Sequence, residues 1–126
     1  MIFGVGVDIA KVSRFEKWAK NPALIERFFN ERERISATAR LQRAAEHYAS
    51  RFAAKEAFSK SLGTGFSNLV LADFWVEHGK NGEAILVLGE KTQKIVREIL
   101  KSDYCIHLSI SHEKEFAVAF VVLEKK

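Results

Sequence analysis

The first residues of the chain alternate between large apolar side chains and small or polar ones, which predicts a β-strand over residues 3–9. One face carries Phe3, Val5, Val7 and Ile9, and the other carries Gly4, Gly6 and Asp8. Because glycine weakens a strand, the two glycines indicate that another backbone or a ligand approaches the face that bears Asp8. Crowded packing within a sheet is the plainer alternative.

Helical patterns follow this strand. Apolar residues recur at helical spacing over 12–19, and Asn21-Pro22 ends this segment and opens the next. Asn30 followed by Glu33 resembles a capping box, which predicts a further helical start near residue 31. The first half of the chain is therefore expected to be mostly helical.

The longest helix is predicted over residues 39–62, because this stretch is rich in alanine and Gly63 is placed to end it. Projected at about 100° per residue from Leu41, Glu56 falls at roughly 60° and Lys60 at roughly 100°, beside the core-facing side. An unpaired carboxylate is costly to bury. Glu56 therefore needs a partner, which is either Lys60 one turn away, an arginine or a cation.

The second half changes character and predicts two hairpins that flank a helix. The segments are strands over Leu69–Val76 and Ala84–Leu88, a helix over Glu90–Lys101, and strands over Cys105–Ser111 and Phe116–Leu123. Asn81-Gly82 is the strongest turn signal in the chain. The order of strand, helices, hairpin, helix and hairpin predicts an α+β fold with a largely antiparallel sheet packed against the long helix.

Length and composition limit the alternatives. The 126 residues form a single domain over 1–126, and the 48% of hydrophobic residues supports a packed core. No apolar run approaches the ~18 residues that span a bilayer, and the start lacks a signal-peptide pattern. Together with the lone Cys105, this indicates a cytoplasmic protein without membrane association. A cleft between domains would require a second subunit.

Charge is distributed unevenly along the chain. Residues 1–62 carry 12 basic and 7 acidic side chains, whereas residues 63–126 carry 8 and 9. A phosphate-bearing or acidic partner is therefore expected on the surface of the first half, although a solvated helical face also explains the bias. A basic nucleic-acid-binding module is the alternative function. The inner position of Glu56 and the absence of an RNA-binding aromatic motif count against it.

Asp8 and Glu56 are the strongest candidates for chemistry. One lies on the glycine face of the strand, and the other lies on the inner side of a helix that must pack on that strand. Two carboxylates suit Mg²⁺ completed by water and substrate phosphates, and Lys60 would neutralise phosphate oxygens. No Gly-x-x-x-x-Gly-Lys-Ser/Thr loop or Gly-x-Ser-x-Gly elbow occurs, which disfavours a nucleotide hydrolase or a serine hydrolase.

Three blocks of the sequence resemble a known family, the small bacterial holo-acyl-carrier-protein synthases, which are 4′-phosphopantetheinyl transferases. The blocks are residues 4–9 (GVGVDI), residues 51–60 (RFAAKEAFSK) with 63–65 (GTG), and residues 109–112 (SISH). Their order and spacing cover essentially the whole chain. The resemblance implies the 4′-phosphopantetheinyl transferase fold.

The resemblance also implies a reaction. 4′-Phosphopantetheine would pass from coenzyme A to a serine of apo-acyl carrier protein, which gives holo-acyl carrier protein and adenosine 3′,5′-bisphosphate and serves fatty acid biosynthesis. Small members of the family are similar in forming homotrimers with active sites at subunit interfaces. Mg²⁺ would be the cofactor and coenzyme A the co-substrate.

Site residues carry over from the resemblance position by position. Asp8 and Glu56 would bind Mg²⁺, and Lys60 would contact the phosphate near the reacting centre. Glu56 would accept the serine proton either directly or through a metal-bound water, and the sequence leaves both open. The remaining ligand-binding positions are Arg51 and His112 at the 3′-phosphate, Ser111 beside His112 in the sequence, and Gly63, Thr64 and Gly65 along the ligand's path.

Acyl carrier proteins are acidic, so basic residues on the first helices are expected to form the docking surface. These residues are Arg14, Lys17 and Arg27. One departure from the family pattern lies in the central turn, where Gly82-Glu83-Ala84 replaces the frequent Gly-Lys-Pro. This change puts a ligand contact from that turn in doubt.

Overall fold

The computed structural model describes residues 1–63 and 68–126 and confirms the α+β order of elements. The chain runs β1 (Ile2–Lys11), α1 (Phe15–Ala19), α2 (Pro22–Phe28), α3 (Leu41–Leu62), β2 (Phe74–His78), β3 (Ala84–Leu88), α4 (Glu90–Leu100), β4 (Tyr104–His112) and β5 (Phe116–Lys125). Short 3-10 turns lie at Val12–Arg14, Glu31–Glu33 and Leu71–Asp73. In the described part of the chain no helix is long and apolar enough to cross a membrane.

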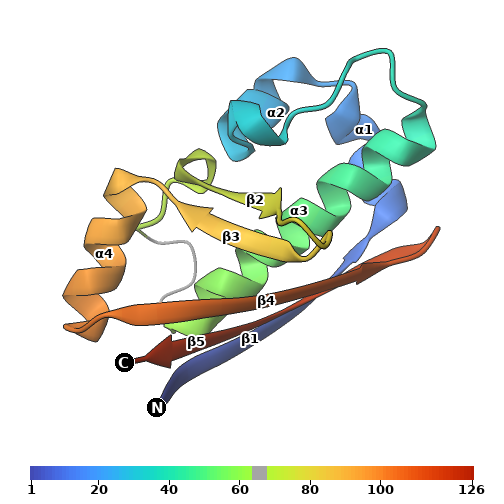
Figure 1. The fold of residues 1–126 in the computed structure, drawn as a ribbon. Helices are drawn as coiled ribbons and strands as arrows, with labels where there is room; N and C mark the ends of the chain where they lie inside the picture. Colours follow the sequence, from blue (N-terminus) through green and yellow to red (C-terminus); the bar gives the residue numbers. More distant parts are fainter. Residues whose placement is uncertain (64–67) are drawn as a thin grey trace.

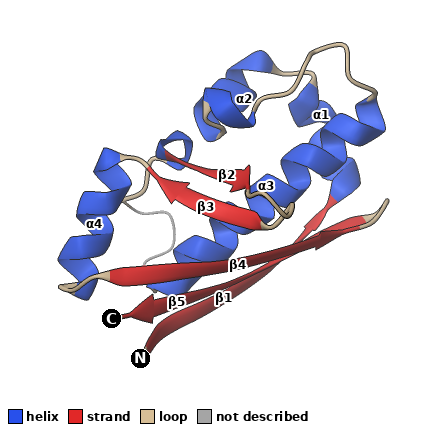
Figure 2. Ribbon diagram, in the orientation of Figure 1, coloured by secondary structure: helices blue, strands red, loops and turns tan. Residues whose placement is uncertain are grey.

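The strands form two antiparallel sheets around α3. The larger has the order β1-β5-β4, and the smaller is the β2-β3 hairpin. Figure 1 shows the larger sheet running along one side of α3, with α1 and α2 near the start of that helix and α4 near its end. The helical and strand layers are distinguished by colour in Figure 2.

The glycine face of β1 is where α3 packs. A Cβ atom on Gly4 would lie 2.0 Å from the carbonyl oxygen of Ser61, and one on Gly6 would lie 1.8 Å from that of Ala57. Both contacts are impossible for a larger residue, so glycine is what allows the helix backbone to reach the strand. This confirms the expected approach of another backbone, and it places Asp8, on the same face, against α3.

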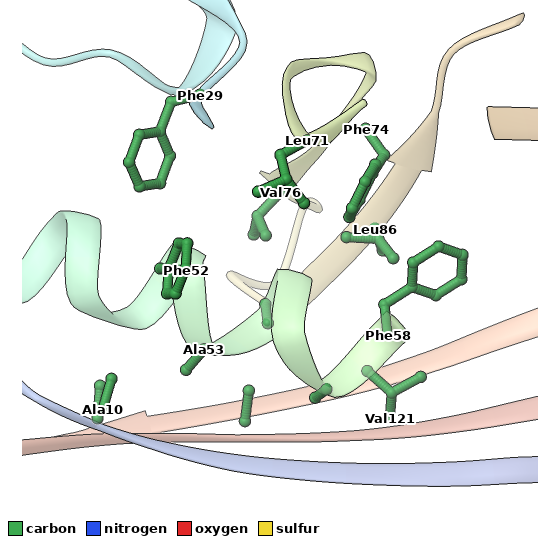
Figure 3. Close-up of a cluster of buried hydrophobic side chains, with 14 of the residues drawn as sticks. Ala10, Phe29, Phe52, Ala53, Phe58, Leu71, Phe74, Val76, Leu86 and Val121 are labelled. Atoms are coloured by element: carbon green, nitrogen blue, oxygen red, sulfur yellow. The ribbon is translucent and has the colours of Figure 1, made fainter. Parts of the chain in front are cut away.

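Aromatic and aliphatic side chains from every layer fill the core. Phe52 of α3 packs against rings of α1 and α2, and Phe58 packs against Phe74 of β2, whereas Ala53 lies toward the sheet (Figure 3). The alanines of α3 are small enough for close packing of the helix on the sheet, and Ala53 and Ala57 are fully buried. The helix is thus enclosed on most sides rather than along one stripe.

A buried ion pair fixes the loops around α3, and the sequence analysis missed it. Lys55 Nζ lies 2.8 Å from Glu33 Oε1, and neither side chain is exposed to solvent. The ammonium group also donates to the carbonyl oxygens of Leu71, at 2.7 Å, and Phe74. Because these carbonyls turn toward Lys55, the predicted strand over 69–76 is wrong in its first part and begins only at Phe74.

The other element boundaries agree with the sequence patterns. Asn21 caps α2 with Pro22 in its first turn, and Gly63 ends α3 with a positive φ of 80°. The capping box of Asn30 and Glu33 forms, although it opens a 3-10 turn rather than a longer helix. The first predicted helix is likewise split into a 3-10 turn and α1.

Candidate active site

The structure brings together the three residues expected at the reacting centre. Lys60 Nζ lies 3.2 Å from Asp8 Oδ1 and donates to the carbonyl oxygen of Val7 at 3.0 Å. Glu56, one turn earlier on α3, lies close enough to Asp8 that the charge of Asp8 raises its pKa. The alternation of side chains in β1 and the helical spacing of side chains in α3 therefore place the carboxyl groups of Asp8 and Glu56 next to each other.

The carboxyl groups of Asp8 and Glu56 repel each other when both are ionised, and a bound cation reduces this repulsion. Burial raises the pKa of Glu56, and the neighbouring Asp8 raises it further, whereas Lys60 and Arg14 lower it. Two carboxylates side by side with one lysine leave an excess of negative charge when all are ionised. This donor set of carboxylate oxygens fits a hard divalent cation such as Mg²⁺.

The position and the partner of Lys60 both differ from what the helical projection predicts. Lys60 lies 52% exposed at its side chain and is not on the core side. Its ion pair in the described residues is with Asp8 across the helix–strand contact, and not with Glu56 along the helix. Lys60 is therefore free to turn its ammonium group toward a bound phosphate.

A second group of predicted residues lines a cavity of about 400 Å³ between α3, the β2-β3 turn and β4. Arg51 and His112 both line it, as the resemblance implies. Gly82, Glu83 and Ala84 also line it, so the turn that departs from the family pattern does border this cavity. Ser111 is not among the lining residues, whereas Leu108, Ser109 and Ile110 of the same strand are.

Arg51 carries a positive charge that this chain leaves largely uncompensated. Burial lowers its pKa, and Glu33, which opposes this effect, is already bound to Lys55. In the described residues its Nε atom has no hydrogen-bond partner, and no carboxylate forms an ion pair with it. A partly buried guanidinium of this kind is suited to binding a phosphate group.

His78 contacts Arg51 and was missed by the sequence analysis. Arg51 Nη2 lies 2.9 Å from His78 Nε2, and His78 Nδ1 lies 3.2 Å from the carbonyl oxygen of Gly82. A guanidinium only donates hydrogen bonds, so Nε2 accepts and Nδ1 carries the proton toward Gly82. The imidazole of His78 is therefore neutral, and the hydrogen bond that it accepts holds Arg51 in place. The contact depends on the folding back of the hairpin, which no local pattern reveals.

Two other histidines near this cavity are either neutral or already paired. Burial, with a smaller effect from Arg51, lowers the pKa of His47 to about 4, and its ring donates to the carbonyl oxygen of Glu33. His112 Nδ1 lies 3.3 Å from Glu46 Oε1. The positive charge that faces the cavity therefore comes mainly from Arg51.

The two groups of site residues point in different directions from α3. Arg51 and Glu56 are five residues apart, which separates them by about 140° around the helix and about 7.5 Å along it. Asp8, Glu56 and Lys60 are accordingly absent from the lining of the Arg51 cavity. Gly63 lies at the end of α3, and the other two residues of its motif, Thr64 and Gly65, lie outside the described residues.

The basic residues predicted to dock a partner are exposed on α1, α2 and the turn before them. The guanidinium of Arg14 lies 5.5 to 5.8 Å from the ring centres of Phe15, Trp18 and Phe52. Arg27 lies 5.1 Å from that of Phe28, and Lys17 extends into solvent. Since Arg14 also lowers the pKa of Glu56, this surface adjoins the carboxylate pair.

Comparison with known proteins identifies the family of this chain. The family model of the 4′-phosphopantetheinyl transferase superfamily matches residues 4–121. A holo-[acyl-carrier-protein] synthase of Treponema denticola is 44% identical over 98% of this chain and 99% of its own, and one of Pelagibacter ubique is 43% identical over 99% and 98%.

Solved structures show the same fold. The crystal structure of a holo-(acyl-carrier-protein) synthase from Bacillus anthracis, in complex with CoA (3′,5′-ADP), superposes with a TM-score of 0.82 at 39% identity and covers 100% of this chain and 99% of that one. Family match, sequence identity and fold therefore agree over the whole length. The chain belongs to the 4′-phosphopantetheinyl transferase superfamily, as an enzyme of the holo-[acyl-carrier-protein] synthase kind.

Proposed function

We propose that this protein transfers 4′-phosphopantetheine from coenzyme A to a serine of apo-acyl carrier protein and releases adenosine 3′,5′-bisphosphate, with Mg²⁺ as cofactor. The observation that carries the proposal is the contact of Asp8, Glu56 and Lys60 at the packing of β1 on α3. A pair of carboxylates beside a half-exposed lysine suits the positioning of a diphosphate. Relatives named holo-[acyl-carrier-protein] synthase supply the substrate class.

Asp8 and Glu56 would hold the Mg²⁺ ion, because their crowded carboxyl groups gain from a shared cation. When bound, the ion neutralises the diphosphate and stabilises charge on the transferring and leaving oxygens. Glu56 takes the proton from the serine hydroxyl, directly or through water. Lys60 binds the phosphate oxygens on which charge develops.

The transfer exchanges a phosphoanhydride bond of the diphosphate for a phosphate ester bond to serine. The serine oxygen forms a bond to the phosphorus that bears the pantetheine group, and the bond from that phosphorus to the bridging oxygen of the diphosphate breaks. The leaving group departs as adenosine 3′,5′-bisphosphate. Arg51 and His112 would bind its 3′-phosphate in the cavity beside the β2-β3 turn, with His78 holding Arg51 in place. Thr64 and Gly65, next to Gly63, and also Ser111, keep their proposed ligand contacts.

Two observations support a homotrimer with sites at subunit interfaces. The face of the larger sheet that points away from α3, here called the outer face, exposes a set of large apolar side chains by 40% to 62%: Phe3, Val5, Val7, Ile9, Phe116 and Phe120. Such a surface is typical of an interaction site. In addition, the carboxylate pair and the Arg51 cavity diverge on α3, so a neighbouring subunit would bring one group to the other.

The function is tested by one mass measurement. The protein is incubated with coenzyme A, Mg²⁺ and an apo-acyl carrier protein, and the carrier is weighed by mass spectrometry. We expect a gain equal to one phosphopantetheine group on the carrier. No gain across several apo-carrier proteins, under conditions where a known synthase modifies them, would contradict the proposal.

Substitution of Phe120 by Lys is expected to disrupt the assembly. A charge at the middle of the outer face would be buried without a partner in an interface, whereas the isolated subunit tolerates it at a position that is 44% exposed. Light scattering coupled to size exclusion should show a shift from trimer to smaller species. Ile85→Lys is the matched control, because Ile85 is 43% exposed on the other sheet. Equal masses for both variants and the unaltered protein would argue against this interface.

Substitution of Arg14 by Glu is expected to raise the KM for carrier protein about tenfold or more, while the KM for coenzyme A changes little. An opposite charge at the docking surface repels an acidic partner and slows its association. Arg14→Ala separates loss of the charge from its reversal. Lys91→Glu on α4 makes the same change in net charge far from this surface. If Arg14→Glu and Lys91→Glu have equal effects, docking at Arg14 is excluded.

A further inference from the structure

A second set of ligating side chains lies on the outer face, away from the carboxylate pair. Cys105 and His107 come from β4, and Glu124 comes from β5. One ligand atom from each, the thiol sulfur, an imidazole nitrogen and a carboxylate oxygen, lies within 4.8 Å of the other two. No step of the proposed transfer uses these three residues.

The strand register explains why they meet. Cys105 pairs directly with Glu124, and His107 pairs with Val122 on the neighbouring strand. Residues two apart on a strand share a face, so Cys105 and His107 lie side by side above the same partner strand. Since all three side chains stand on paired strands rather than on a loop, the backbone holds them in place.

The hydrogen bond between His107 and Glu124 places a proton where a metal ion would bind both side chains. His107 Nε2 lies 2.9 Å from Glu124 Oε1, with both side chains about half exposed. A metal ion at this point would accept both the imidazole nitrogen and the carboxylate oxygen, and the Cys105 sulfur lies within reach as the third ligand.

We propose that Cys105, His107 and Glu124 form a zinc-binding site on the outer face. Sulfur, nitrogen and oxygen donors together suit a borderline-soft ion such as Zn²⁺, whereas Mg²⁺ prefers oxygen alone. Three protein ligands leave a fourth position for water. The site is therefore chemically distinct from the carboxylate pair. A bound ion would tie β4 to β5 close to the C-terminal end of the chain and stabilise the larger sheet.

Cobalt(II) is the probe, because it replaces zinc and reports a thiolate ligand through a charge-transfer band in the near ultraviolet. The sequence contains a single cysteine, so such a band can come only from Cys105. We expect one Co²⁺ per chain, displacement of the band by Zn²⁺, and a thermal unfolding midpoint that rises with Zn²⁺ concentration. Asp8→Asn with Glu56→Gln should leave the band unchanged.

Variants of the three ligands complete the test. Cys105→Ser should remove the band, and His107→Gln and Glu124→Gln should weaken Zn²⁺ binding, measured against a coloured chelator, by more than the roughly 10- to 100-fold typical of losing an outer-shell partner. Ser109→Ala, on the same face of β4, is the matched control and should bind as the unaltered protein does. Absence of a thiolate band in the unaltered protein, or a Zn²⁺ affinity that the three ligand substitutions leave unchanged, would overturn the proposal.

Discussion

Replacing Glu56 with Gln should lower the rate of transfer by about 10²- to 10⁴-fold, the range for loss of a positioned general base. Glutamine keeps the size of the side chain but neither takes a proton nor offers an anionic oxygen to a cation. Both proposed roles of Glu56 are removed together, while its position on α3 is preserved. The initial rate of holo-carrier formation, followed by mass spectrometry at saturating coenzyme A, measures the effect.

The same variant should fold normally, which separates a chemical role from a structural one. Burial and the adjacent Asp8 disfavour the ionised form of Glu56 and raise its pKa. A carboxyl group with a raised pKa in the folded state makes the protein less stable as the pH rises and the group ionises. The neutral glutamine escapes this penalty, so without metal the variant should unfold at the same temperature as the unaltered protein or higher.

Glu98→Gln, an exposed change on α4, removes one negative charge without touching the site and is the matched control for activity. We expect it to retain the rate of the unaltered protein. Full transfer activity in Glu56→Gln would eliminate both roles assigned to Glu56. A loss of activity accompanied by a lower unfolding temperature would indicate a structural role instead.

The carboxylate pair could be predicted because two simple periods point to it. Alternation in β1 puts Asp8 on the face that Gly4 and Gly6 leave bare, and only a close-packed helix can use such a face. The projection of the long helix then turns Glu56 toward that strand. The local pattern and the tertiary packing agree at Asp8 and Glu56, so the sequence alone was enough to predict that these two residues lie together.

The same projection fails where α3 is enclosed from several sides. It places Ser50 about 180° from Leu41, on the polar side, yet Ser50 is only 1% exposed. It places Lys55 about 40° from Leu41, on the core side, but gives no indication that Glu33 is its partner. A projection assumes one apolar stripe, whereas α3 contacts the large sheet, the hairpin and the N-terminal helices. Contacts that depend on the hairpin, such as His78 with Arg51, need the tertiary fold.

The wrong start of the strand predicted over 69–76 has a related cause. A short apolar run fits a buried strand and a buried loop equally well. Here the carbonyl oxygens of Leu71 and Phe74 bind the ammonium group of Lys55, while the carboxylate of Asp73 accepts the backbone N–H of Thr92 at 2.8 Å. Both partners are far away in the sequence, so no local signal marks the loop.

Replacing Lys55 with Met should lower the free energy of unfolding by about 3–5 kcal/mol, the usual loss when one partner of a buried ion pair is removed. Methionine fills a similar volume but leaves Glu33 ionised, 2% exposed and without its counter-charge. The carbonyl oxygens of Leu71 and Phe74 lose their donor as well. Urea unfolding followed by circular dichroism measures the change.

The companion variant Lys55→Met with Glu33→Gln separates the charge from the packing. The N–H groups of Asn30 and Val76 donate to Glu33 Oε1 and Oε2, each at 3.1 Å, and glutamine keeps an oxygen for one of them while carrying no charge. We therefore expect the double variant to be more stable than Lys55→Met alone, which is a strongly non-additive result in a double-mutant cycle. Additive losses would mean that Lys55 contributes through its methylene chain and its carbonyl contacts, and not through its charge.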